Sequence, residues 1–357
     1  MKVALVYDRV NKWGGAERVI IALRKIFPDA PVYTSVYRED RASWAKKIPV
    51  VTTFLQKIPF APQFHEAFAV FMPIAFESFN FDEFDLVISV TSEAAKGVIT
   101  KPKTRHISII LTPTRYLWSG YHDYFANPIL KLVSYPVVSY LRFWDRIAAN
   151  RPDSLIAIST TVQARIKKYY GLGSEIIYPP LMVRNFKQIQ NTKYKIPNTK
   201  YFLVVSRLVP YKRIDLAVRA ANRLKIPLKI IGTGSESSKL KKMAGPTVEF
   251  LGYVSDSDLK YYYANCRALI FPGIEDFGLT MVEAQAFGKP VIAYRGGGAE
   301  EIIIEGKTGK FFQRQKVADL AALLKNFRPS RYNSLDCRKN ARRFSYEEFK
   351  QKILGII

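Results

Sequence analysis

Two glutamates eight positions apart, Glu275 and Glu283, stand near the C-terminal end of the chain. The apolar run Ala268 to Phe271 before them predicts a buried strand, and Phe277-Gly278-Leu279 between them has the pattern of a helix N-terminus. Such a terminus offers backbone N–H groups and a positive dipole end to a phosphate. Glu283, about two turns into the helix, can accept both hydroxyls of a ribose. The pattern favours a nucleotide-sugar site, with solvated surface glutamates as the alternative.

Two cations, Arg207 and Lys212, follow the expected strand 201–205 after Ser206. A diphosphate leaving group gains negative charge as a glycosidic bond breaks. Fixed cations at that point stabilise the transition state more than the ground state. The spacing therefore predicts a diphosphate clamp that does the work of a metal ion, and a basic surface loop is the alternative.

Three further loops contain residues that can approach a phosphate or a base. Glycine lets backbone come close to a phosphate, because no Cβ intervenes. None of these loops has the spacing of the dinucleotide fingerprint, and ordinary strand-to-helix turns explain them equally well. The candidate residues are Gly14 and Gly15, Gly232 and Gly234, and Tyr253 and Val254.

Elements that could position these residues form two successive strand–helix series. Between the series, the lysine-rich segment Arg184 to Lys200 lacks the apolar periodicity of a helix or strand and is expected to be a linker. A capped amphipathic helix is expected to begin at Ser345. The expected strands are 3–7, 86–89, 107–110, 155–158 and 176–177, then 201–205, 228–231, 248–250, 268–271 and 291–293.

The Glu275–Glu283 stretch resembles the E-x7-E signature of retaining glycosyltransferases of the GT-B fold, in the large family-four group that includes bacterial mannosyltransferases. The resemblance extends over most of the chain. It implies an α/β fold with two Rossmann-like domains facing across a cleft: residues 1–183 bind the acceptor and residues 184–344 the donor. The terminal helix, 345–357, would cross back onto the first domain. Segments that carry the resemblance in the N-terminal half are 95–98, 111–118, 121–124, 144–146 and 178–180.

The resemblance also implies roles. Arg207, Lys212 and Glu275 would be catalytic, and Gly14-Gly15 would contact the donor's distal phosphate and sugar. Tyr253-Val254 would contact the nucleobase through its backbone. Transfer would retain configuration, with the leaving phosphate oxygen taking the acceptor's proton and no metal or other cofactor required. The expected donor is GDP-mannose, with a UDP-sugar second.

Two positions depart from the family pattern. Relatives have histidine where Leu111 stands, beside the transferred sugar, and often where Ser92 stands. Leucine cannot donate a hydrogen bond to a sugar hydroxyl. Either the donor sugar or its contacts differ, or the chain is a catalytically impaired nucleotide-sugar-binding homologue. His65, His106 and His122 are interpreted as core or surface residues.

A formal net charge of +25 indicates an anionic partner. Apolar stretches at 68–76 and 132–141, with basic residues at 142–168, favour docking on an anionic membrane near a glycan or lipid-linked acceptor. Buried core helices are the alternative for these stretches. A nucleic-acid-binding protein remains a rival, although no nucleic-acid module is recognised.

Cysteine content and hydropathy set further expectations. Cys266 and Cys337 are the only cysteines, which argues against a disulfide framework or zinc knuckle and for a reducing cytoplasm. No apolar run approaches the ~20 residues that span a bilayer. We therefore expect a peripheral protein at the inner membrane face. The acidic pair in Asp256-Ser257-Asp258 is expected to open a helix rather than to bind a metal.

Overall fold

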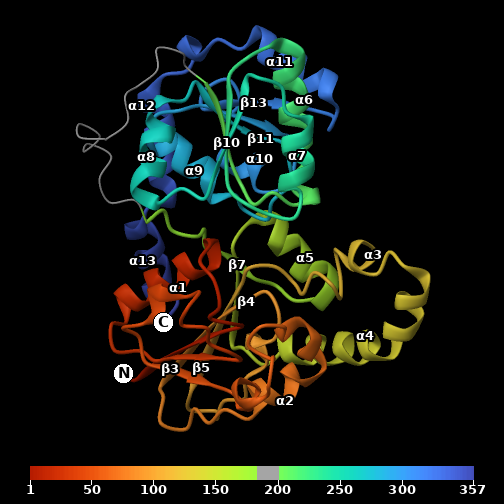
Figure 1. Ribbon diagram of the computed structural model, residues 1–357. Helices are drawn as coiled ribbons and strands as arrows, with labels where there is room; N and C mark the ends of the chain where they lie inside the picture. The colour runs from red at the N-terminus through yellow and green to blue at the C-terminus, as the bar shows by residue number, and fades with distance from the viewer. Residues whose placement is uncertain (183–200) are drawn as a thin grey trace. The chain divides into compact units, whose positions relative to one another are not determined.

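The computed structural model describes residues 1–182 and 201–357, so the predicted linker, Arg184 to Lys200, lies outside the described residues. The described chain divides into two compact units. Unit 1 consists of Met1–Pro180 with Phe349–Ile357, and unit 2 of Leu181–Glu348. Each unit is built on one parallel sheet with helices around it (Figure 1).

Unit 1 contains a parallel sheet with the strand order β3-β2-β1-β4-β5-β6-β7 among its described residues. The central strands β1 and β4 are buried along their whole length, as strands covered on both faces must be. The strands are β1 (Val3–Tyr7), β2 (Val32–Thr34), β3 (Val50–Thr52), β4 (Leu86–Thr91), β5 (Arg105–Ile110), β6 (Ser154–Ala157) and β7 (Glu175–Ile176). The α-helices are α1 (Gly15–Ile26), α2 (Met72–Glu77), α3 (Tyr121–Tyr124), α4 (Pro128–Ala149) and α5 (Thr160–Tyr170), with short 3-10 turns that include η3 (His65–Phe71) and η4 (Ala95–Gly97).

Unit 2 contains a second parallel sheet, with the order β10-β9-β8-β11-β12-β13 in the described residues. Counted from its own first strand, this is the order 3-2-1-4-5-6 of a Rossmann fold. The strands are β8 (Phe202–Val205), β9 (Leu228–Ile231), β10 (Val248–Gly252), β11 (Ala268–Phe271), β12 (Val291–Tyr294) and β13 (Gly309–Phe312). The helices are η5 (Pro210–Lys212), α6 (Ile214–Leu224), α7 (Ser237–Met243), α8 (Asp256–Asn265), α9 (Leu279–Ala286), α10 (Ala299–Ile302), α11 (Val317–Asn326) and α12 (Ser334–Ala341).

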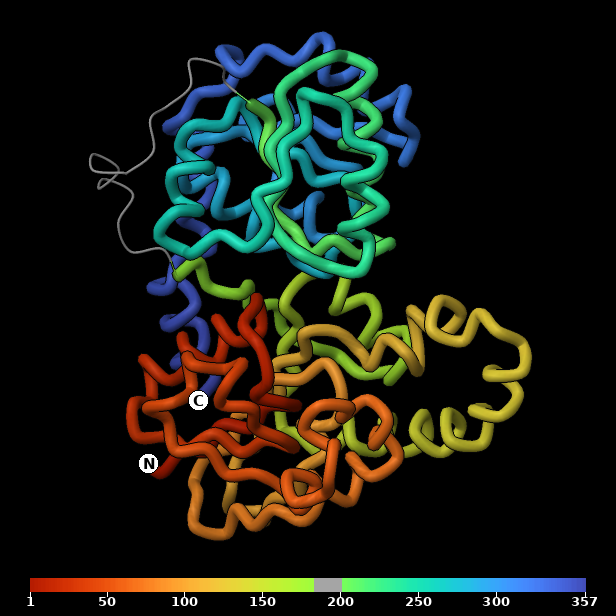
Figure 2. Tube along the Cα trace, in the orientation of Figure 1, coloured from red at the N-terminus to blue at the C-terminus, as the bar shows by residue number. Residues whose placement is uncertain are grey.

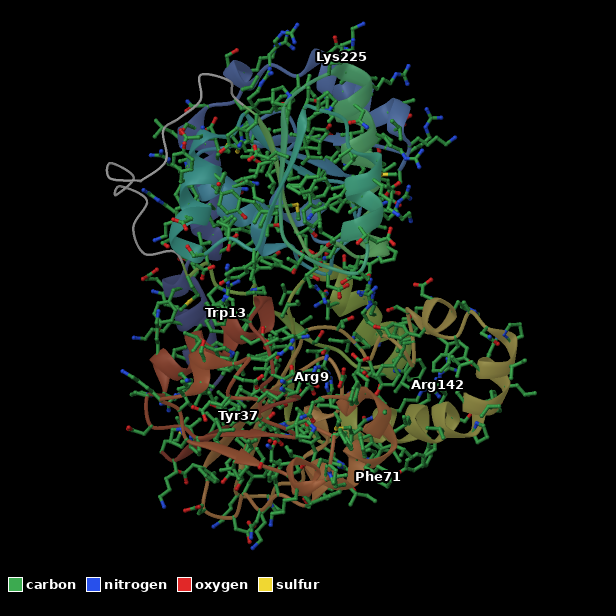
Figure 3. All side chains as sticks on the ribbon, in the orientation of Figure 1. Arg9, Trp13, Tyr37, Phe71, Arg142 and Lys225 are labelled. Atoms are coloured by element: carbon green, nitrogen blue, oxygen red, sulfur yellow. The ribbon has the colours of Figure 1, made fainter. Side chains whose placement is uncertain are left out.

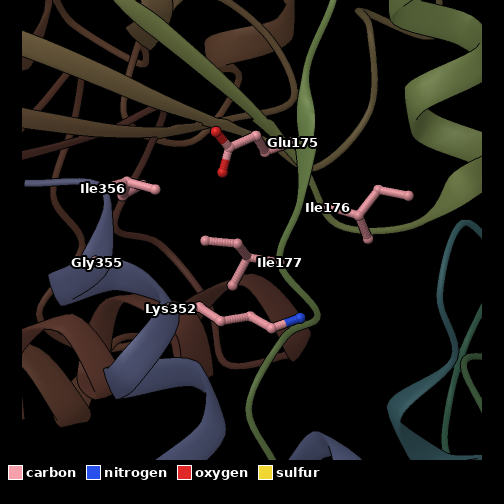
Figure 4. Close-up of a pocket in the computed structure, with 6 residues that line it drawn as sticks. All are labelled: Glu175, Ile176, Ile177, Lys352, Gly355 and Ile356. Carbon is pink, nitrogen blue, oxygen red and sulfur yellow. The ribbon is translucent and has the colours of Figure 1, made fainter.

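The last helix, α13 (Tyr346–Gly355), begins one residue after the predicted Ser345, and its residues from Phe349 onward belong to unit 1 (Figure 2). Ser345 caps it, since its Oγ accepts a hydrogen bond from the Glu348 N–H at 3.2 Å. Figure 4 shows its end beside β7, where Lys352 and Ile356 line a pocket together with Ile177. The predicted return of the terminal helix to the N-terminal domain is confirmed.

Most strands lie where the apolar runs predict them, with ends that differ by one or two residues. Strands β2, β3 and β13 are not among the predicted strands. Two of these have three residues, too few to show an alternation, and β13 contains a glycine and an exposed lysine. No helix in the described part of the chain is long and apolar enough to cross a membrane.

Candidate donor site

The two predicted clamp cations lie on the loop between β8 and α6 and share one aromatic neighbour. Arg207 is exposed, and its Nη2 donates a hydrogen bond to the Tyr211 hydroxyl at 2.5 Å. The Lys212 Nζ lies 5.0 Å from the centroid of the same ring. Tyr211 thus holds one cation by its hydroxyl and the other by its ring face. Tyr211 is not among the predicted site residues, although its place between the two cations in the sequence was a signal for this role.

Lys212 also forms an ion pair with Glu275, so the structure brings together two of the three predicted catalytic residues. They come from the loops after β8 and β11, which are neighbours in the sheet. Lys212 is 6% exposed, whereas the Glu275 side chain is 28% exposed. The close approach of the loops requires Gly273, because a Cβ there would lie 2.9 Å from the Lys212 Cα. Ser206, Lys212 and Gly273 line one pocket of unit 2.

Helix α9 begins where the sequence predicts. Its N-cap, Gly278, has φ +104°, a left-handed conformation that favours glycine, and supplies no side-chain cap. The N–H groups of Leu279 and Thr280 start the helix and have no acceptor within it, so they can bind an anion, whereas the Met281 N–H already donates to the Gly278 carbonyl at 2.9 Å. The Phe277 side chain is buried and packs edge-on against Phe344 at 5.4 Å. Any donor contact from Phe277 therefore has to come from its backbone.

Glu283 lies inside unit 2 rather than on its surface. The prediction that it stands about two turns into the helix is wrong, because α9 begins at Leu279 and Glu283 is its fifth residue. Its side chain is almost wholly buried, and Oε2 accepts a hydrogen bond from the Tyr263 hydroxyl at 2.7 Å. Tyr263 in turn stacks on Phe287 at 5.7 Å. This support was missed, since no local pattern links α8 to α9.

Packing accounts for two of the remaining glycines. A Cβ on Gly232, where φ is +132°, would lie 1.9 Å from the Ser206 carbonyl oxygen, and one on Gly234 would lie 2.2 Å from the Leu208 oxygen. Both glycines therefore let the loop after β9 press against the clamp loop. Tyr253 is 78% exposed directly after β10, and Val254 beside it is half-buried. Donor contacts of these four residues remain predictions.

Gly14 and Gly15 lie in unit 1, where Gly14 is the N-cap of α1. A Cβ added to Gly14 would meet only the Glu17 carboxylate, at 3.1 Å. Glu17 is buried and accepts a hydrogen bond from the Tyr7 hydroxyl at 2.6 Å. Burial first and the Glu17 charge second raise the pKa of Tyr7, so the phenol stays protonated.

The two positions that depart from the family pattern lie at the carboxyl ends of β4 and β5. The Ser92 N–H and hydroxyl both donate to Asp8, at 2.6 and 3.3 Å. Asp8 is buried, and its pKa is raised by burial and then by the nearby Glu93 charge. Leu111 is half-buried, and its N–H donates to the Thr91 carbonyl at 2.7 Å. Ser92 thus binds Asp8, a residue that sequence reasoning did not select.

None of the three histidines belongs to unit 2, which carries the clamp. His106 is buried in β5, with Nε2 3.0 Å from the Ser89 hydroxyl, and His65 lies 3.3 Å from Asn11. Burial lowers the pKa of each to about 4. His122 is exposed. All three are in unit 1, in agreement with their interpretation as core or surface residues.

The acidic pair at the start of α8 does not point to a metal. The helix begins at Asp256, and Ser255 caps it by accepting a hydrogen bond from the Asp258 N–H at 3.2 Å. The prediction that Asp256-Ser257-Asp258 opens a helix is confirmed, with Ser255 as the cap. Among the described residues, no group of three His, Cys, Asp or Glu side chains could hold a metal ion.

Comparison with known proteins matches residues 186–344 to the family model "Glycosyl transferases group 1". An uncharacterized glycosyltransferase of Methanocaldococcus jannaschii is 27% identical over 50% of this chain and 50% of its own length. A GDP-mannose-dependent alpha-(1-6)-phosphatidylinositol monomannoside mannosyltransferase of Mycolicibacterium smegmatis is 31% identical over 46% of this chain and 50% of its own length. The chain spans about half the length of these curated relatives.

A solved structure, HepE of Anabaena in complex with UDP, matches the whole architecture. Its TM-score is 0.72 at 20% identity, over 100% of this chain and 99% of that one. The chain therefore has the GT-B fold, as predicted. The match to the glycosyl transferases group 1 family model covers less than half of the chain.

Proposed function

We propose that the chain is a retaining glycosyltransferase that moves a hexose from a nucleotide-diphosphate sugar to a glycan or lipid-linked acceptor. The observation that carries this proposal is the Lys212–Glu275 pair, which lies within the residues that match the group 1 family model, with Glu275 on the loop that leads into α9. A charged lysine, a second cation on the same loop and a helix N-terminus together match the needs of a departing diphosphate.

Each residue then has a distinct task. Lys212 and Arg207 neutralise the charge that develops on the diphosphate, and the N–H groups at Gly278 and Leu279 bind its oxygens. Glu283, held by Tyr263, accepts the ribose hydroxyls. On donor binding, Lys212 turns from Glu275 to the diphosphate, and Glu275 becomes available to a sugar hydroxyl. The leaving phosphate oxygen takes the acceptor's proton, and neither a metal nor another cofactor is required.

GDP-mannose is the favoured donor and mannose the transferred sugar, because the Mycolicibacterium relative is named for that substrate. A UDP-sugar is second, because HepE has been crystallised with UDP-glucose. The high positive charge suits a peripheral protein at the inner face of the cell membrane, where lipid-linked acceptors are found.

The test is a calorimetric titration with GDP-mannose and UDP-glucose, followed by assays of donor hydrolysis and of transfer to a lipid-linked acceptor. Binding of one donor with measurable turnover is expected. Failure of both donors to bind would overturn the proposal.

A second candidate is a homologue that binds the nucleotide sugar without transferring it. The observation that favours this function is that Leu111 has no polar group and Ser92 donates its hydroxyl to Asp8. Binding without turnover in the same assays would select this function.

A further inference from the structure

Helix α4 of unit 1 has two apolar faces. One face is buried and carries Val138, Leu141, Trp144 and Ala148. The other consists of residues that recur every three or four positions and so form one stripe along the helix. We call this set the outer stripe: Ile129, Val133, Pro136, Tyr140, Phe143 and Ile147.

The outer stripe is exposed along most of the length of the helix. Ile129 is 74% exposed, Val133 70% and Phe143 67%. Large apolar side chains gathered in this way on a surface mark an interaction site, whereas scattered ones do not. In Figure 1, α3 and α4 project from the sheet of unit 1.

The opposite face of α4 is fixed by a buried polar network. Asp145 forms an ion pair with Lys96 at 2.5 Å, and both side chains are almost wholly buried. The same carboxylate accepts hydrogen bonds from the Trp118 indole at 2.7 Å and the Tyr170 hydroxyl at 2.8 Å. A satisfied network of this kind sets the rotation of the helix, so the outer stripe points away from the core of unit 1.

Basic side chains lie on other sides of α4 and on α5. At about 100° per residue, Lys131, Arg142 and Arg146 lie about 100° or more around the helix from the middle of the stripe. Lys167 and Lys168 are exposed near the end of α5. Figure 3 labels Arg142 on this projection. Within the described part of the chain, none of these five cations forms an ion pair with an acid. Arg142 instead packs on the Tyr121 ring at 4.4 Å.

The elements packed against α4 add to the exposed apolar surface. Met72 and Phe76 of α2 share a core cluster with Trp144 and Ala148 of α4. Next to that contact, Phe71 is 45% exposed and Ile74 57%. In the apolar stretch 132–141, only Val138 and Leu141 are buried, so the alternative of a fully buried core helix does not hold for this stretch, and docking on a membrane stays a prediction.

We propose that the outer stripe of α4 docks unit 1 on an anionic lipid bilayer, with the helix lying in the interface plane. Aliphatic and aromatic side chains would enter the headgroup region, while the net positive charge of the chain attracts acidic lipid headgroups. This inference rests on the proposed function at one point only: the docked surface would bring the protein to a membrane-borne acceptor.

The charge favours a bilayer over other occupants. Two copies of a chain with a net charge of +25 would bring like charges together at this face. Nucleic acid would satisfy the cations, but it offers no apolar phase for Ile129, Val133 and Phe143. A bilayer with acidic lipids meets both requirements.

The experiment uses the full chain and vesicles of phosphatidylcholine with and without phosphatidylglycerol, across a salt series. Val133→Gln and Phe143→Gln are compared with Leu335→Gln, which changes a residue of unit 2 that is 70% exposed and so matches them in exposure. Each stripe variant should lower vesicle partitioning by about tenfold or more, as expected when one large apolar side chain no longer leaves water. The Leu335→Gln variant should bind like the parent chain, and thermal unfolding should be similar for all.

Equal vesicle binding by all variants would overturn the proposal. So would a stable dimer that Phe143→Gln dissociates, or tight binding of single-stranded RNA with no vesicle binding at any salt concentration. Titration with nucleotide sugar keeps the two proposals apart. The parent chain could bind vesicles through the stripe and yet bind no nucleotide sugar. That result would reject the proposed function and leave this inference in place.

Discussion

Lys212 is nearly excluded from water and is paired with a carboxylate that is itself partly open to solvent. If Lys212 stabilises the leaving diphosphate, Lys212→Ala should lower kcat/KM. The loss should correspond to about 2.7–4 kcal/mol of transition-state stabilisation, the effect of removing one preorganised donor. Lys241→Ala, which removes an exposed lysine on α7, is the matched control. Steady-state kinetics that show the same kcat/KM for the Lys212 variant and the parent would reject the assignment.

Substitutions of the two glutamates should differ in their effect on the affinity for bare nucleotide. Glu283→Gln should weaken binding of the nucleoside diphosphate as well as the whole donor, because the ribose is present in both. Glu275→Gln removes the charged partner of Lys212. The affinity of this variant for bare nucleoside diphosphate should therefore be unchanged or higher, while its affinity for the intact donor should fall. Calorimetry in which both variants lose equal affinity for bare nucleotide would contradict this division.

Tyr211 should act as a positioning residue for Arg207. Tyr211→Phe removes the hydroxyl that accepts from Arg207 and keeps the ring under Lys212, so donor affinity should fall by about 0.5–1.5 kcal/mol, the net worth of one hydrogen bond. In an Arg207→Ala background the same change should have little effect. Additive losses in the double variant would show that Tyr211 acts independently.

Among the elements, the loop after β9 should support the clamp through Gly232. Gly232→Ala would press a Cβ against the Ser206 carbonyl at a positive φ, and should lower the free energy of unfolding by about 3 kcal/mol or more while weakening donor binding. Gly306→Ala, at φ +81° with open space around it, should cost only about 1–2 kcal/mol and leave binding unchanged. Equal thermal shifts for the two variants would argue against the contact.

Apolar runs such as 86–89 and 268–271 predicted the central strands because both faces of a parallel sheet are buried. The same reasoning placed Lys212 and Glu275 on loops at strand ends. Their direct pairing depends on β8 and β11 being neighbours, a long-range contact that no local pattern encodes. The support of Glu283 by Tyr263 and the rotation of α4 set by Asp145 also depend on distant side chains.

On the scale of the whole molecule, two buried histidines should make stability depend on pH. Burial lowers the pKa of His65 and His106 to about 4, whereas an unfolded histidine has a pKa near 6.5. Between these values the unfolded chain binds more protons, so the free energy of unfolding should fall as the pH falls from about 6.5 to about 4, by about 3 kcal/mol for His106.

Denaturant titrations at several pH values provide the measurement. His106→Gln should flatten the slope in this window, and His122→Gln, at an exposed position, should leave it unchanged. Parallel slopes for His106→Gln and the parent would show that this residue does not control the acid response.

The two cysteines have a practical consequence. Cys266 and Cys337 are both free and buried, and burial raises the pKa of their thiols to about 12 and about 11. Because the thiolate is the reactive form, neither should react with maleimides near neutral pH. A cysteine introduced at exposed Ser139 of α4 would then carry the only label on an otherwise native chain. A fluorophore at that point could report, in real time, when the helix leaves water for lipid.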